Sequence, residues 1–190
     1  MQLTINKEQQ ALLHARKFTM YLGIAGMVML FAALTSAYLV RRSAGNWLEF
    51  GLPSVFYIST IVIVLSSLTM HGSVRAYKKG NERGYISLLG TTVILAIAFL
   101  VFQFQGWMEL NEIGVYLQTN PSASFLFVIT GLHAAHVVGG VAALIVAMIK
   151  AAKLKFRVTP KRLNGLQITA IYWHFVDVLW IYLIIFFVLQ

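Results

Sequence analysis

The sequence contains no cysteine and very few acidic side chains. Only 6 of its 190 residues are Asp or Glu, and charged residues of both signs make up 11% of the chain. The absence of cysteine excludes disulfide bonds, thiolate metal sites, iron–sulfur clusters and cysteine nucleophiles. Soluble domains have about a quarter of their residues charged. Because hydrophobic residues reach 59% here, the composition predicts an integral membrane protein, a single membrane domain over 1–190.

Five apolar stretches lack Lys and Arg and are long enough to cross a bilayer, since about 20 helical residues span a hydrocarbon core of roughly 30 Å. Apolar runs such as 61–65 lack the period-two alternation of barrel strands, which favours helices. The polar segment 1–17 has no small-residue cleavage site after it, so we expect a retained first helix. The predicted fold is an all-α integral membrane protein, a five-transmembrane-helix bundle with helices at about 18–40, 54–73, 86–106, 124–149 and 169–189.

The basic residues gather on one side of this predicted bundle. The tail, the loop after the second span and the loop after the fourth carry all 15 Lys and Arg residues except Arg41 and Arg42. By the positive-inside rule, the N-terminus is cytoplasmic and the C-terminus lies outside. Topology and anionic lipid headgroups therefore account for the net charge of +9, and we expect no nucleic-acid partner.

Five ionisable side chains lie inside or at the ends of the predicted spans. His133 and His136 are three residues apart on the fourth span. His174 and Asp177 have the same spacing on the fifth, and His71 ends the second. Residues three apart share a helix face, and ionisable groups at this depth face the bundle interior or a partner. Haem ligation by two histidines, a proton relay and a structural network all stay open. We expect Asp177 to bond one or more histidines, because an unpaired buried carboxylate is costly.

The fourth span also carries a series of small residues at a spacing of four. Such a stripe lets helix backbones approach closely inside a membrane. We expect the stripe to serve helix packing, with a functional groove as the alternative. Its members are Gly131, Ala135, Gly139, Ala143 and Ala147.

The end of the third span has an amphipathic pattern. Trp107 precedes Glu109 and Glu112 on the predicted outer side. Trp beside acidic residues is typical of interfacial anchoring. A cation site at the two glutamates is the weaker alternative.

Two longer motifs resemble the cytochrome c oxidase subunit III family. The run 172–180, Tyr-Trp-His-Phe-Val-Asp-Val-Leu-Trp, is similar to the signature of that family's last helix. The run 127–140, which holds both histidines of the fourth span, resembles the preceding helix. The stretch 67–71 at the start of a basic loop also fits, as does Gln105 leading to Glu109. The motifs occur in family order and spacing, and the resemblance covers essentially the whole transmembrane part.

The sequence departs from the family pattern at two points. The long family form has seven helices, and this chain resembles the five that follow the first two. Members of the family hold phospholipids in a cleft between the first two helices and the other five. That cleft is therefore not expected to be complete within this chain. Met27 stands where the family usually has a membrane-embedded glutamate, so we expect no carboxylate-dependent role for that span. Lys150 falls where the family places a basic residue near lipid headgroups, which implies contact with phospholipid.

The resemblance implies an accessory subunit of a haem–copper terminal oxidase in the bacterial inner membrane. Such a subunit binds neither haem nor copper, so no catalytic or metal-ligating residue is expected here. The haems and copper are expected in partner chains. The implied partners are the catalytic subunit I together with subunits II and IV, and a larger respiratory supercomplex is a further option. Lipid binding and support for proton uptake are implied as well.

Other assignments stay open at this stage. An accessory protein of a nitric oxide reductase or a quinol oxidase would share the last-helix motif. A free-standing membrane haem protein, which is a different class, would use His133 or His136 together with His174.

Overall fold

The computed structural model describes residues 7–118 and 120–190, and this part of the chain forms five long helices. All five are long and apolar enough to cross a membrane, which confirms the prediction of an all-helical protein with five spans. Residues 1–6 of the predicted polar tail, and residue 119, lie outside the described ranges. The helices are α1 (Lys7–Ser43), α2 (Ser54–Lys78), α3 (Glu82–Glu112), α4 (Pro121–Lys153) and α5 (Pro160–Leu189).

The helices are longer than the apolar spans that predict them. α1 begins at Lys7 rather than near residue 18, and α3 continues to Glu112. A helix satisfies its own backbone hydrogen bonds in water as well as in lipid. The ends of a helix can therefore carry charged side chains and extend past the bilayer. The length of an apolar stretch predicts only the part of the helix that lies inside the bilayer.

Side-chain caps set the starts of three helices. Asn81 accepts a hydrogen bond from the backbone N–H of Gly84, and Asn120 and Thr159 cap α4 and α5 in the same way. A proline follows the cap in α4 and α5, at the position where a missing N–H breaks no helical bond. Gly80 has a positive φ of 74°, which allows the tight turn between α2 and α3.

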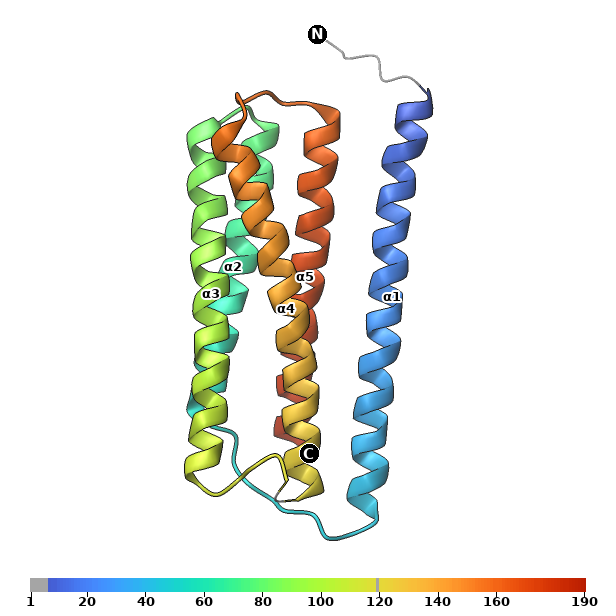
Figure 1. Cartoon of the computed structure of the whole chain (residues 1–190), viewed down its shortest axis with the longest axis vertical. Helices are drawn as coiled ribbons and strands as arrows, with labels where there is room; N and C mark the ends of the chain where they lie inside the picture. The colour runs from blue at the N-terminus through green and yellow to red at the C-terminus, as the bar shows by residue number, and fades with distance from the viewer. Residues whose placement is uncertain (1–6, 119) are drawn as a thin grey trace.

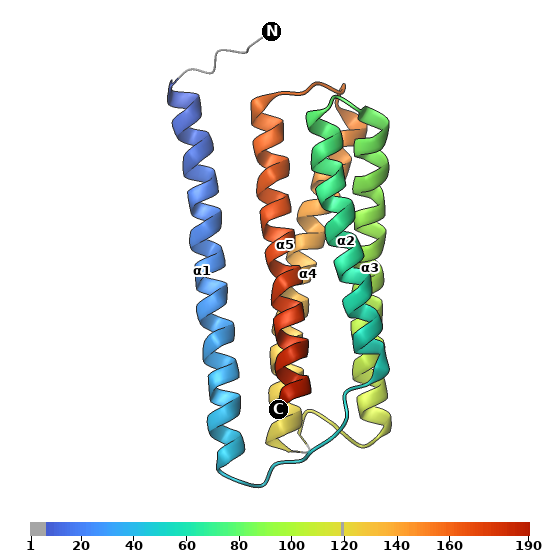
Figure 2. The ribbon, with the colours of Figure 1, turned by 180° about the vertical axis from the view of Figure 1, so that it is seen from behind.

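Four helices, α2 to α5, form the main bundle, and α1 stands at its side (Figure 1). Among the described helices α1 contacts α4 and α5 but neither α2 nor α3. Viewed from behind, α5 lies between α1 and α2 (Figure 2). The start of α1, the α2–α3 turn and the α4–α5 loop lie at one end of the molecule (Figure 1), and the basic residues other than Arg41 and Arg42 belong to these segments.

Two tryptophans of α5 occupy the centre of the bundle. Trp173 and Trp180 are both 0% exposed. The indole N–H of Trp173 donates to the Ser66 hydroxyl at 3.0 Å, and that of Trp180 donates to the Thr60 hydroxyl, also at 3.0 Å. These bonds fix α5 against α2, because a buried indole N–H without an acceptor would be costly.

The small residues of α4 are placed differently from the prediction. Ala135 and Gly139 are exposed, and a Cβ added to Gly131 would meet no atom within 4 Å. The stripe therefore does not pack inside this chain over most of its length. The close approach is made one residue further along, at Gly140, where a Cβ would lie 2.9 Å from the ring of Trp173. The spacing of small residues could not show which face of α4 meets α5.

Candidate functional site

A polar seam joins α2 and α5 inside the membrane-spanning part. The hydroxyl oxygen of Ser67 and Nδ1 of His174 are 2.6 Å apart. The ring of His71 lies beside that of His174, with 6.1 Å between the ring centroids. His174 is half-buried and His71 is exposed, so the seam reaches the surface of the bundle.

Asp177 lies one helical turn from His174 but points to the interior. Its side chain is 2% exposed, and neither carboxyl oxygen has a hydrogen-bond partner in the described ranges. Ser67 lies beside the Asp177 carboxyl group, yet its hydroxyl is engaged with His174. Asp177 is therefore a buried carboxyl group without a bonded partner in the described part of the chain.

The two histidines of α4 lie among aromatic rings. His133 is 0% exposed and stacks on Trp180 with 5.0 Å between ring centroids. Phe31 of α1 contacts both His133 and His136, at 6.5 and 5.8 Å between centroids, which agrees with their common helix face. Nδ1 of His136 lies 2.7 Å from the carbonyl oxygen of Leu132, whereas neither ring nitrogen of His133 has a partner in the part of the chain described.

The expected hydrogen bond between Asp177 and a histidine is therefore not present among the described residues. His174 turns to the α2 seam, whereas His133 packs against Trp180. A haem at His133 would have to displace the packed aromatic rings around it. Within the described ranges, no three His, Cys, Asp or Glu side chains come close enough to hold a metal ion.

The C-terminal end of α3 is anchored by its tryptophan. The indole N–H of Trp107 donates to the Thr130 hydroxyl of α4 at 3.0 Å. Gln105 is exposed and Glu109 is half-buried, one on each side of Trp107 along the helix. Among the described residues, none forms an ion pair with Glu109. A shared functional motif of Gln105 and Glu109 therefore stays a prediction.

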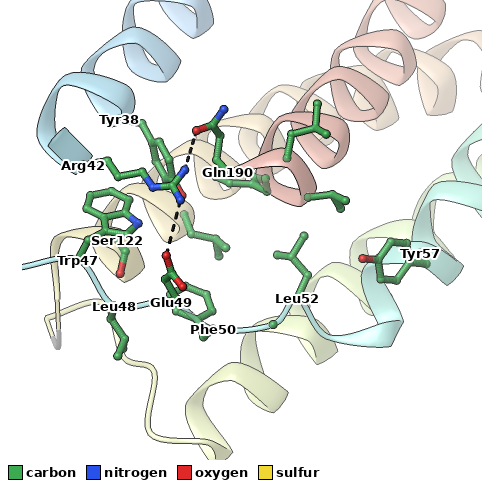
Figure 3. Close-up of a pocket in the computed structure, with 15 residues that line it drawn as sticks. Tyr38, Arg42, Trp47, Leu48, Glu49, Phe50, Leu52, Tyr57, Ser122 and Gln190 are labelled. Atoms are coloured by element: carbon green, nitrogen blue, oxygen red, sulfur yellow. Dashed lines mark hydrogen bonds and ion pairs between the residues drawn. The ribbon is translucent and has the colours of Figure 1, made fainter.

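A pocket of about 450 Å³ at the end opposite the basic loops was not predicted from the sequence (Figure 3). Arg42 donates to the Gln190 side chain at 2.7 Å and lies 3.7 Å from the Glu49 carboxylate. Trp47 packs edge-on against Tyr38, with 4.7 Å between ring centroids. Arg42 thus ties the α1–α2 loop to the end of α5. No local signal could have found this arrangement, because it joins residues 148 positions apart.

A second pocket, of about 430 Å³, lies among α1, α4 and α5 at the basic end, and Tyr77 of α2 and Tyr85 of α3 also line it. Its apolar wall includes Ala143 and Ala147 of the small-residue stripe, and no acidic residue lines it. At the same end Lys17 of α1 donates to the Gln167 side chain of α5 at 2.9 Å. Four basic side chains line the pocket, namely Arg16, Lys150, Lys161 and Arg162. Lys150, which the sequence singled out, is therefore one of a cluster rather than a lone cation.

Comparison with known proteins identifies the family. The family model described as cytochrome c oxidase subunit III matches residues 5–189. Cytochrome c oxidase subunit 3 of Corynebacterium diphtheriae is 35% identical over 166 residues, which cover 83% of this chain and 80% of the relative. Cytochrome c oxidase subunit 3 of a Synechocystis species is 31% identical over 175 residues, covering 90% and 73%. A probable cytochrome c oxidase subunit 3 of Nocardia farcinica is 31% identical over 164 residues, covering 83% and 79%.

The family match extends over nearly the whole chain. It includes essentially all of the five helices and every ionisable residue of the seam and the core. The relatives cover most of both sequences, so the similarity does not rest on one motif. The chain is a multi-pass membrane protein that belongs to the cytochrome c oxidase subunit III family.

Proposed function

We propose that this protein is the accessory subunit III of a bacterial haem–copper terminal oxidase, located in the inner membrane and serving aerobic respiration. The match to the subunit III family over residues 5–189 carries this proposal. The bundle packs against the catalytic subunit I, which holds the haems and copper, and subunits II and IV complete the assembly. The chain itself contributes no redox centre. Its role is to stabilise the catalytic subunit and to support proton uptake.

The charge distribution supports an orientation with the N-terminus in the cytoplasm and the C-terminus outside. One end of the bundle carries every Lys and Arg except two, and basic loops are retained on the cytoplasmic side. On this orientation the pocket among α1, α4 and α5 opens at the cytoplasmic leaflet, and the pocket at Arg42 opens outside.

We infer that the cytoplasmic pocket binds the headgroup of an anionic phospholipid. Its four basic side chains, Arg16, Lys150, Lys161 and Arg162, attract a phosphate group, and basic pockets between transmembrane helices suit such headgroups. The apolar wall at Ala143 and Ala147 gives an acyl chain a surface without long side chains. The complementarity of charge and shape supports a lipid here, since a neutral ligand would not need four cations.

The lipid assignment is tested by native mass spectrometry of the purified complex. Lys150→Ala together with Arg162→Ala should lower the amount of retained anionic phospholipid several-fold. The control is Arg75→Ala, which removes a basic residue at the same end but outside the pocket. Equal retention in the pocket variant and the control would contradict the assignment.

The oxidase assignment is tested by identifying the chains that co-purify in mild detergent. A large haem–copper subunit together with a copper-bearing subunit II is the expected result. Nitric oxide reductase chains would instead place the protein in that related complex. A chain that purifies alone would contradict the accessory role, and a Soret band in the pure chain would point to a haem protein.

A further inference from the structure

One exposed histidine lies near the end of an apolar span. The five apolar spans lie entirely in the described part of the chain, and within them His71 is the one Lys, Arg, His, Asp or Glu side chain that is exposed. Its ring makes no hydrogen bond to any described residue. Polar groups that face hydrocarbon without a partner are costly, and inside membranes they mark contacts with other helices.

His174 adds a second polar group to the same surface. Its Nδ1 is engaged with Ser67 at 2.6 Å, while its Nε2 has no partner among the described residues. The two imidazole rings lie 6.1 Å apart between centroids. Exposed apolar side chains flank them on both helices, with Leu68 of α2 at 65% and Val178 of α5 at 63% exposure. We call this surface, formed by Ser67, Leu68, His71, His174 and Val178, the α2–α5 face.

The arrangement of helices leaves this face open. α5 lies between α1 and α2 (Figure 2), and α1 makes no contact with α2 in the described ranges. The exposed side of α3 is different, because it presents apolar side chains such as Ile94, Ile97, Val101 and Phe104 through its middle. Polar side chains on an otherwise apolar helix face are typical of hydrogen-bonded helix–helix contacts inside membranes, whereas a purely apolar face suits lipid.

We propose that a transmembrane helix of the partner oxidase subunit docks on the α2–α5 face and offers a hydrogen-bond acceptor to His71 and His174. The acceptor is a carboxylate, amide or hydroxyl oxygen, because a neutral imidazole always carries one N–H donor and the tautomer with Nε2–H directs that of His174 away from Ser67. The inference rests on the proposed function and names the face through which that function is exercised.

Photo-crosslinking in the assembled complex tests the location. A photoreactive phenylalanine analogue is placed at Leu68, and in a matched control at Ile94 of α3, which is 68% exposed. The Leu68 probe should attach to a large oxidase chain, and the Ile94 probe to lipid alone. A Leu68 probe that captures only lipid, while the oxidase still co-purifies, overturns the docking face and leaves the proposed function intact. Absence of any oxidase chain from the unsubstituted preparation overturns both.

Substitution of His71 tests the chemistry. His71→Leu should weaken retention of this chain by the catalytic subunit about 3- to 20-fold in detergent titration, which is the range of one interhelical hydrogen bond. His71→Gln keeps a donor and should restore most of the retention. His14→Leu, a change at an exposed histidine of α1 outside the spans, is the control. Equal retention of native and His71→Leu chains, each with an unchanged thermal midpoint, would overturn the hydrogen-bond role.

Discussion

Gly140 shows how closely α4 and α5 approach at a single residue. A Cβ at this position would lie 2.9 Å from two ring carbons of Trp173, and that ring is fully buried. We predict that Gly140→Ala lowers the free energy of unfolding by about 1–3 kcal/mol, because overpacking a rigid core outweighs the gain in helix propensity. Gly131→Ala is the matched control and should be neutral or slightly stabilising, since its Cβ would meet open space. Unfolding of the detergent-solubilised chain measures both, and equal stabilities would contradict the packing argument.

The buried carboxyl group of Asp177 leads to a second prediction at this scale. Because neither of its oxygens has a bonded partner in the described chain, replacing it with a neutral amide of the same size removes a burial cost and no hydrogen bond. Asp177→Asn should therefore leave the stability of the isolated chain unchanged or raise it. Ser67→Ala, which breaks the contact with His174, should lower it by about 1 kcal/mol. Chemical unfolding compares the two, and a loss of more than about 2 kcal/mol for Asp177→Asn would indicate a network that the structure does not contain.

At the scale of elements, the start of α4 depends on one side chain. Asn120 accepts hydrogen bonds from the backbone N–H of Ser122 and of Leu48, and it donates to the carbonyl oxygen of Asn46. It therefore caps α4 and also ties down the α1–α2 loop. We predict that Asn120→Ala costs about 1–2 kcal/mol of stability and speeds proteolysis in that loop. Asn111→Ala, at an exposed position near the end of α3, should change neither quantity, and similar effects in both variants would contradict the capping role.

Sequence predicts these elements better than it predicts their contacts. The five spans follow from local apolar length, whereas the Asn-Pro and Thr-Pro pairs at 120–121 and 159–160, where α4 and α5 begin, are start signals that apolar length does not capture. The common face of His133 and His136 follows from helix geometry. The seam between Ser67 and His174 does not, because it depends on the rotation of two helices whose residues are 107 positions apart. For the same reason the stripe of small residues from Gly131 to Ala147 did not include Gly140, where α4 and α5 approach closely.

Considered as a whole, the molecule divides into three levels along its long axis. One end is basic and holds the pocket lined by Arg16 and Lys150. The middle has a buried aromatic core around Trp173 and Trp180, and the two histidines of the α2–α5 face lie between this core and the basic end. At the other end, Arg42 contacts Glu49 of the α1–α2 loop and Gln190 after α5, and so holds these two segments together. An accessory subunit needs this division, because its two ends meet different compartments while its side must recognise a partner inside the lipid.

The whole-molecule prediction concerns the direction in which this axis crosses the membrane. Moving the basic end through the bilayer is disfavoured, so the α2–α3 turn should be cytoplasmic and the α1–α2 loop should lie outside. The chain has no cysteine, so a single added thiol reports the side on which it lies. In right-side-out vesicles, a membrane-impermeant maleimide should label Ala44→Cys directly, and Lys79→Cys only after permeabilisation. The reverse pattern would invert the topology and put the basic pocket in the outer leaflet, where anionic lipid could no longer explain its charge.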